Sequence, residues 1–323
     1  MVIRYQFGRD DLLRTRFAIA PLMDLLGAFY VLREAGRSVV HRPWREWARP
    51  RTAGLDLSLL DVAAPSDGPG FWPVFVGPPP QVPHAEIGSE LERIRATPPT
   101  QVQAEIMRTY PSGLAAARPF TDDPAGALAE LVREMQAFWD AALAPWWTQM
   151  SAVLESEIAW RARRLVTSGP QAAFTGLHQT VHWDKDTLVV HPTGKAPADV
   201  DLAGRGLLLI PAIFTWPKVW PRTDPPWDPA LVYPATGIAG VWATDGQDND
   251  ALEALIGQRR AQILRELDRP ASTLQLAQRM QTSAGGISDH LKILRRAGLV
   301  TGRREGRQVI YTRTAKGDTL RSR

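Results

Sequence analysis

The C-terminal segment 251–323 carries a hydrophobic pattern that leaves few alternatives for its fold. Apolar residues recur at helical spacing up to Asp268, Pro270 prevents that helix from continuing, and a second helical pattern begins at Ser272. A third helical pattern follows a turn at Gln281-Thr282, and strand-like alternation follows Gly298. The spacing therefore predicts two helices, a turn, a third helix and a two-stranded wing.

Charge is divided unevenly between this segment and the rest of the chain. Residues 251–323 hold 15 Lys and Arg against six Asp and Glu, a net charge of +9, whereas the preceding 250 residues hold 23 against 28, a net charge of −5. Because basic side chains that neutralise phosphates release counterions, a compact basic unit predicts a polyanionic partner. The mildly acidic body needs another explanation.

The two helices around the turn have recognisable starts and faces. Ser272-Thr273-Leu274-Gln275 has the order of a capping box, and Ser283 is expected to cap the next helix. The positions expected to face the core are Leu274, Ala277, Met280, Ile287, Leu291 and Leu294. The outer face of the second helix holds Ser288, Asp289, Lys292 and Arg295. A polar helix after a short turn is the geometry that enters the major groove of DNA.

These residues resemble a known family. The segment Ser-x-x-x-Ile-Ser-Asp-His-Leu-Lys-Ile-Leu-Arg-Arg-Ala-Gly, which starts at Ser283, resembles the recognition helix of ArsR-type winged-helix repressors, and Arg303 to Tyr311 resembles their wing. The resemblance covers roughly the last fifth of the chain. It implies a cytoplasmic, homodimeric transcriptional repressor that binds double-stranded DNA. The helix at about Ser283–Ala297 would lie in the major groove, and Arg303–Arg307 on the backbone or in the minor groove.

A second resemblance lies in the body. It is carried by Ile3-Arg4-Tyr5, by Arg14-Thr15-Arg16-Phe17 with Pro21-Leu22, by Gly204-Arg205-Gly206-Leu207 and by Leu231-Val232-Tyr233-Pro234. In this order they resemble the uncharacterised N-terminal domain that is fused to such heads in actinobacterial regulators. This resemblance implies no known chemistry.

Two departures from the ArsR pattern change what it implies. Metal sensors of the family carry Cys-Val-Cys where this chain has Leu274-Gln275-Leu276-Ala277, and the chain has no cysteine. Sensing through thiolates is therefore excluded, and we predict no metal and no cofactor. The family also dimerises through a helix after the wing, but few residues follow Tyr311. We expect dimerisation through the body or through a helix starting near Ala251.

The predicted DNA contacts are Thr273, Ser283, Ser288, Asp289, His290, Lys292, Arg295, Arg303, Arg304 and Arg307. Ser288 and Lys292 are expected to reach base edges or phosphates, and the wing arginines to contact the backbone. Asp289 either accepts a hydrogen bond from a cytosine amine or pairs with a neighbouring Arg; pairing is favoured because phosphates repel a carboxylate. His290 is interpreted as a packing or phosphate contact rather than as a metal ligand.

The predicted fold class is α+β. The body, residues 1–242, is expected to be mainly helical over 1–168 with a small β region over 169–242, and the winged helix-turn-helix to occupy 243–323. Expected helices are Leu12 to Leu32, broken or kinked at Pro21, then Pro124 to Ala144 and Pro145 to Arg164. Expected strands are His178 to Trp183 and Thr187 to Val190 as a hairpin, Leu207 to Phe214, and Leu231 to Tyr233. Ala63 to Pro83, rich in Pro and Gly, is expected to be loop.

Tryptophans mark the body as a candidate binding domain. All twelve precede residue 243, and five crowd the predicted β region: Trp183, Trp216, Trp220, Trp227 and Trp242. These five form a candidate pocket for a small hydrophobic or aromatic effector. The alternative is that they fill a core or a subunit interface.

Other side chains suggest no catalytic site. His178, His182 and His191 lack a closely spaced carboxylate and are expected to be surface or core histidines. Glu130, Glu134, Glu155 and Glu157 are expected on solvated helix faces. A phosphate-binding glycine loop, a serine-centred elbow and an HExxH motif are absent from the sequence, so no enzyme activity and no catalytic residue are predicted.

Localisation and two rival functions complete the expectations. Neither a secretory signal nor an apolar run of membrane-spanning length stands in the sequence, which favours the cytoplasm and no membrane partner. An enzyme body fused to a DNA-binding head, or a protein-interaction module, stays open as an alternative.

Overall fold

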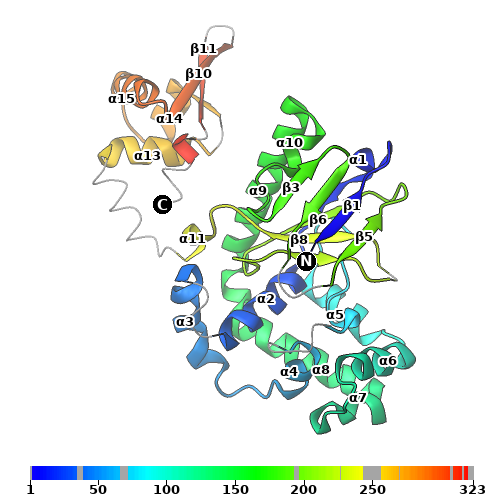
Figure 1. Cartoon of the computed structure of the whole chain (residues 1–323). Coiled ribbons are helices and arrows are strands. Elements are labelled where there is room, and N and C mark those ends of the chain that lie inside the picture. The colour runs from blue at the N-terminus through cyan, green and yellow to red at the C-terminus, as the bar shows by residue number, and fades with distance from the viewer. Residues whose placement is uncertain are drawn as a thin grey trace. The chain divides into compact units, whose positions relative to one another are not determined.

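A computed structural model of the chain describes residues 2–34, 39–65, 72–192, 196–225, 227–242, 256–268, 270–305, 308–314 and 316–318. The chain divides into two compact units, Met1–Ile238, here called the body, and Ala239–Arg323, here called the head (Figure 1). The predicted α+β class is confirmed. The polar run 245–250 and the helix start expected near Ala251 lie outside the described residues.

Two four-stranded sheets lie in the body. The first has the order β3 (Val181–Asp184), β4 (Thr187–Val190), β1 (Ile3–Gln6) and β5 (Ala198–Asp201), with β1 antiparallel to β4 and parallel to β5. The second has the order β2 (Arg16–Phe17), β6 (Leu208–Ala212), β8 (Ala230–Pro234) and β7 (Trp220–Arg222). In it β2, β6 and β8 are parallel and β7 runs antiparallel to β8.

The predicted hairpin is confirmed, but each sheet also recruits a strand from the N-terminus. Trp183 pairs with Leu188 and Asp184 with Thr187 across the expected turn. In Figure 1 the blue strand β1 lies among green strands that follow it by more than 170 residues in the sequence. Phe17, expected on a helix, is in β2, and Pro21 begins a helix instead of breaking one. Proline suits a first helical turn because its fixed φ is helical and its missing N–H is not needed there.

One hydrophobic cluster joins the two sheets. Strand β1 alternates between buried and exposed side chains, whereas β6 and β8 are buried along their whole length. The Tyr5 hydroxyl of the first sheet donates to the Ala230 carbonyl of the second, at 3.1 Å. The buried members of the cluster are Ile3, Tyr5, Phe7, Phe174, Leu177, Val181, Leu188, Val190, Leu202, Leu207, Leu209, Val219, Leu231 and Tyr233.

Two segments that are distant in the sequence, the one around Asp11 and the one around Gly206, meet at the buried carboxylate of Asp11. Asp11 accepts hydrogen bonds from the Gly8 N–H at 2.7 Å and from the Gly206 N–H at 2.9 Å. Gly206 has a φ of +71°, and a Cβ there would collide with the Arg14 carbonyl group. The close approach of these two segments explains why the motifs around Arg14 and Gly206 occur together.

Helices cover the sheets and pack around α8. The helices of the body are α1 (Asp11–Arg14), α2 (Pro21–Arg33), α3 (Arg42–Thr52), α4 (Ser58–Ala63), α5 (Ile87–Arg95), α6 (Pro99–Thr109), α7 (Arg118–Asp122), α8 (Pro124–Ala142), α9 (Trp147–Ser168) and α10 (Pro170–Phe174). The short helix α11 (Ile238–Val241) spans the junction of the two units. Helix α8 contacts α2 through α7, and its apolar stripe is buried. The two long helices that the sequence predicts, α8 and α9, are confirmed.

The expected loop between 63 and 83 holds a single short 3-10 turn, Val74–Val76, among its described residues. Among the described helices, none combines the length and the apolar character that a membrane-spanning segment needs.

The described residues of the head, beyond α11, form three helices and a three-stranded antiparallel sheet. These elements are α13 (Gln258–Glu266), β9 (Ala271–Ser272), α14 (Thr273–Arg279), α15 (Ala284–Arg296), β10 (Val300–Glu305) and β11 (Gln308–Arg313). The sheet order is β10, β11, β9. The predicted order of helix, helix, turn, helix and hairpin is thus present (Figure 1).

Candidate nucleic-acid interface

Local hydrogen bonds fix the starts of both helices around the turn. The Ser272 Oγ accepts from the Gln275 N–H at 3.3 Å, and the Gln275 side chain accepts from the Ser272 N–H at 2.8 Å. The predicted capping box is therefore confirmed. Ser283 caps α15, because its Oγ accepts from the Gly286 N–H at 3.3 Å. Each cap supplies an acceptor for a backbone N–H that has no partner within its helix.

The head core holds α15 in one orientation. Ile287, Leu291 and Leu294 are buried as predicted, and α13, α14 and β10 contact the helix. The expectation for Leu274 is wrong: that side chain is 55% exposed, and Leu276 is buried in its place. Residues two apart on a helix point about 200° apart, so only one of the two leucines can share a face with Ala277 and Met280.

The outer face of α15 presents the predicted polar side chains. Asp289, Lys292 and Arg295 are exposed and Ser288 is half-buried. Asp289 pairs with Lys292 at 2.8 Å instead of with the expected Arg. The Lys292 ammonium hydrogen-bonds the Asp289 carboxylate and lowers its pKa. Arg296, exposed and one turn after Lys292, was missed by the sequence reasoning, although its i+4 spacing was visible.

Three further predicted DNA contacts are only partly available to DNA: one is engaged as a helix cap and two are half-buried. The Ser283 hydroxyl is engaged as a helix cap. Thr273 is half-buried at the first position of α14. His290 is half-buried, and its Nδ1 makes no hydrogen bond with any residue that the structure describes, which fits a packing position.

The wing is a regular antiparallel hairpin. Arg303 lies opposite Ile310 and Arg304 opposite Val309, and both arginine side chains are exposed. Arg307 lies outside the described residues. Arg313 is a structural residue instead: its guanidinium donates to the Leu264 carbonyl at 2.6 Å and pairs with Asp268 at 2.6 Å. The arginines on the hairpin thus divide into exposed ones near the tip and one that ties the hairpin to α13.

The five tryptophans of the candidate effector pocket have different surroundings. Trp183 stacks on Phe174 in the core with ring centroids 5.0 Å apart, and Trp242 is buried. The Arg93 guanidinium lies 5.3 Å from the Trp227 ring. Trp216 and Trp220 line one pocket together.

The three histidines considered as ligands do not gather. His178 contacts the Thr180 hydroxyl at 2.8 Å, and the rings of His182 and His191 stack 5.4 Å apart. Within the described residues, no group of three His, Cys, Asp or Glu side chains is arranged to hold a metal ion.

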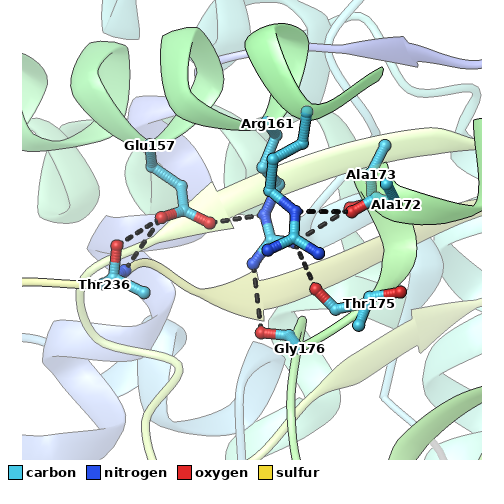
Figure 2. A network of polar contacts seen from close by, with 8 residues as sticks. Glu157, Arg161, Ala172, Ala173, Thr175, Gly176 and Thr236 are labelled. Atoms are coloured by element: carbon cyan, nitrogen blue, oxygen red, sulfur yellow. Dashed lines mark hydrogen bonds and ion pairs between the residues drawn. The ribbon is translucent and has the colours of Figure 1, made fainter. Parts of the chain in front are cut away.

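Two glutamates expected on solvated faces are buried, so that expectation is wrong for them. Glu134 accepts from the N–H groups of Leu59 at 3.1 Å and Leu60 at 2.8 Å, at the start of α4. Figure 2 shows Glu157 on α9 beside Arg161 and Thr236. Helical periodicity does not distinguish a buried carboxylate with partners from a solvated one, because those partners are distant in sequence.

Arg161 is the centre of the network in Figure 2. Its side chain and that of Glu157 are both 0% exposed, and the Arg161 Nε lies 2.5 Å from the Glu157 Oε1. The guanidinium also donates to the carbonyls of Ala173 at 2.8 Å and Gly176 at 3.2 Å. The Thr236 N–H and hydroxyl donate to the other Glu157 oxygen. The network fixes the segments that follow α9 and β8.

Comparisons with known proteins match both parts of the chain. Residues 99–239 match the "Family of unknown function (DUF5937)", and residues 260–303 match a "Helix-turn-helix domain" family. The chain is 44% identical over 62 residues to the "Transcriptional activator HlyU" of Vibrio cholerae serotype O1, which covers 19% of this chain and 57% of that protein. The chain thus spans little more than half the length of this curated relative, which is named for regulation and not for catalysis.

A solved structure, reduced HlyU from Vibrio cholerae N16961, is 30% identical to this chain in sequence. The match covers 24% of this chain and 90% of that chain, and its TM-score is 0.19. The match to the helix-turn-helix family falls on α13, α14, α15 and the start of β10. The C-terminal part of the chain is therefore a helix-turn-helix domain of the ArsR type, and it follows a domain from a family of unknown function.

Proposed function

We propose that the chain is a DNA-binding transcriptional regulator that places α15 in the major groove and the wing on the backbone or in the minor groove. The observation that carries the proposal is the outer face of α15, where Asp289, Lys292, Arg295 and Arg296 are exposed on the side opposite the buried Ile287, Leu291 and Leu294. Such a face leaves charged and polar groups available for base edges and phosphates. The similarity of this region to HlyU, which is named a transcriptional activator, supports the proposal.

The Asp289–Lys292 pair gives α15 a donor and an acceptor side by side. Both side chains are mostly exposed, at 74% and 69%, and an exposed ion pair adds little to stability. The pair is therefore free to open on DNA, with Lys292 turning to a phosphate or guanine and Asp289 to a cytosine amine. Arg303 and Arg304 then contact the backbone from the wing.

The assembly that we infer is a cytoplasmic homodimer formed through the body, which senses a small aromatic molecule. Two heads on a twofold axis read half-sites about 34–36 Å apart, one turn of DNA. Repression is inferred from the ArsR resemblance, and a reporter gene behind the chain's own promoter tests the direction of regulation. Higher expression in the absence of the chain supports repression, and lower expression overturns it.

The test of DNA binding is a titration of the DNA upstream of the chain's own operon at increasing salt. We expect the affinity to fall steeply with salt, because phosphate contacts release counterions. Arg304→Ala should weaken binding to all sequences and reduce the salt slope by about 1, whereas Ser288→Ala should change sequence preference. Arg9→Ala, an exposed arginine of the body, is the control with the same change of charge. Binding that is insensitive to salt overturns the proposal, and identical effects of the two head variants overturn the groove assignment.

A further inference from the structure

A pocket in the body lies where the end of α2 meets the segment between β6 and β7. Its aromatic wall consists of Phe214, Trp216 and Trp220. Trp216 is 43% exposed, which is unusual for so large an apolar side chain. Its neighbour Phe214 is fixed from behind: the Trp44 ring lies 4.4 Å from it, and a Cβ on Gly27 of α2 would lie 2.7 Å from the Phe214 Cβ. The wall is thus partly rigid and partly open to solvent.

Thr215 adds a hydroxyl group with no partner to this pocket. The residue is only 2% exposed, and its Oγ1 makes no hydrogen bond within the described part of the chain. A buried hydroxyl that lacks a partner costs about 1 to 3 kcal/mol. The backbone around it is well held, since Asp24 accepts from the N–H groups of Ile213 at 2.7 Å and Phe214 at 3.0 Å. The hydroxyl oxygen is itself covered, so a ligand that hydrogen-bonds Thr215 must turn neighbouring side chains aside, but not the backbone, to remove this penalty.

The charged residues of the pocket are joined to each other. The Lys218 ammonium donates to the Tyr30 hydroxyl, which in turn donates to Glu34 at 2.6 Å. The ammonium also lies 4.6 Å from the centroid of the Tyr30 ring. Among the described residues that line the pocket, one cation and one anion are linked through a phenol, so their charges balance. The pocket therefore favours an uncharged ligand over an ionic one.

We propose that this pocket binds a small, uncharged aromatic molecule with one hydroxyl group, that is, a phenol. Its ring contacts Trp216 and Trp220, and its hydroxyl pairs with Thr215. The aromatic wall supplies apolar area, and the buried hydroxyl supplies the directional contact that ligand sites typically combine with it. The binding site rests on the pocket alone, whereas the role of the ligand as the effector of DNA binding rests on the proposed function.

The test uses the full chain labelled with 5-fluorotryptophan and titrated with phenol, toluene and benzoate, followed by ¹⁹F NMR. Trp216→Phe and Trp220→Phe assign the two pocket signals. Phenol should shift both signals but not that of Trp183, which stacks in the core. Phenol should bind about fivefold more tightly than toluene, because it alone can hydrogen-bond Thr215. Benzoate should bind more weakly than phenol because it carries a charge.

Two matched variants distinguish the loss of the Thr215 hydroxyl group from a general effect on folding. Thr215→Val keeps the shape and should abolish the preference for phenol over toluene, while the exposed Thr167→Val should keep it. The other tryptophan signals report whether each variant is folded. The site is overturned if phenol leaves both pocket signals in place, if phenol and toluene bind the unmodified chain equally, or if Thr215→Val keeps the preference.

The regulatory role has its own readout, the affinity for operator DNA with and without phenol. A change of affinity that disappears in Thr215→Val supports the effector role. Phenol binding without any change of DNA affinity overturns that role and leaves the site intact. Phenol binding by a chain that binds no DNA overturns the proposed function but again leaves the site intact.

Discussion

The head and the body differ in how far apart their polar partners lie in the sequence. In the head, two helix caps join residues three apart, Ser272 with Gln275 and Ser283 with Gly286, and Arg313 adds longer-range bonds to Leu264 and Asp268. In the body, buried carboxylates bond to backbone groups far away in the sequence, as Asp24 does to Phe214. The separation is 190 residues in that case and 75 for Glu134 and Leu59. The helices of the head are therefore held at their starts by local caps, whereas buried carboxylates join distant segments of the body.

The same contrast governs where the charges lie. The buried charged side chains among the described residues are Asp11, Asp24, Glu90, Glu134, Glu157 and Arg161, and all of them belong to the body. The charged residues on the outer face of α15 and near the tip of the wing are exposed. Charge on the outer face of α15 and near the tip of the wing is thus exposed to a partner, whereas Arg313 of the head and the buried charged groups of the body hold segments together. Substitutions at buried charges of the body should accordingly have the largest effects.

Removing Arg161 should have the largest effect on stability. Arg161→Met leaves the buried Glu157 carboxylate without its cation and the carbonyls of Ala173, Thr175 and Gly176 without this donor, and the expected loss is about 3–5 kcal/mol in the free energy of unfolding. The measurement is urea unfolding followed by tryptophan fluorescence. A Trp242→Phe background confines that signal to the body, because the other eleven tryptophans precede residue 239.

The control for Arg161 is an ion pair on the surface of the same unit. Arg133 pairs with Glu130 on α8, and both side chains are well exposed, so Arg133→Met should change the free energy of unfolding far less than Arg161→Met does. Glu157→Met combined with Arg161→Met should regain part of the loss, since no buried charge is then left unpaired. Equal effects of Arg161→Met and Arg133→Met would show that the contrast between buried and exposed charge is wrong.

This contrast also explains what the sequence could predict. The caps and the apolar face of α15 are encoded within a few residues, so the elements of the head follow from local spacing. Leu274 was misplaced because Leu276, two residues later, competes for the same face. In the body, the short strands β1 and β2 have no periodicity long enough to recognise, and their partners lie about 190 residues away.

The candidate sites also differ in how far local sequence patterns could predict them. The exposed polar face of α15, Arg296 included, follows from helical spacing, although Arg296 was not among the predicted contacts. The tryptophan cluster could not be resolved, because sequence proximity does not show that Trp216 and Trp220 share a pocket while Trp183 lies in the core. The buried Glu157 was predicted on the surface, since Thr236, 79 residues away, is invisible to a local pattern.

Asp24 should give the body a dependence of stability on pH. Burial raises the pKa of Asp24 from 3.8 to about 7, although the N–H groups of Phe214 and Ile213 oppose the shift. Burial likewise raises the pKa of Glu90 to about 8. The folded state holds these protons more tightly than the unfolded state. The stability that they contribute is therefore complete below pH 4 and is lost as the pH rises through 7 to 8.

Asp24→Asn tests this directly, because the amide oxygen can still accept from Ile213 and Phe214 but cannot ionise. We expect the variant to gain about 2 to 4 kcal/mol over the unmodified chain at pH 8, at about 1.4 kcal/mol per pKa unit, and little at pH 4. The measurement is urea unfolding by tryptophan fluorescence between pH 4 and 8. The exposed Asp122→Asn is the control and should show no such trend. If the free energies of unfolding of Asp24→Asn and of the unmodified chain change with pH in parallel, the raised pKa of Asp24 is refuted.

The smallest expected effect is at the cap of α15, and it isolates the head. Ser283→Ala removes the acceptor for the Gly286 N–H and should lower the stability of α15 by about 1 kcal/mol, whereas Ser283→Thr should keep most of it. The measurement is hydrogen exchange of the α15 amides, with tryptophan unfolding in the Trp242→Phe background as the reference for the body. If Ser283 acts as a cap, DNA affinity should follow α15 stability, so Ser283→Thr restores both. If Ser283→Asn, a cap without a hydroxyl group, keeps the helix but not the affinity, the hydroxyl contacts DNA itself, and the local cap of the head also belongs to its binding surface.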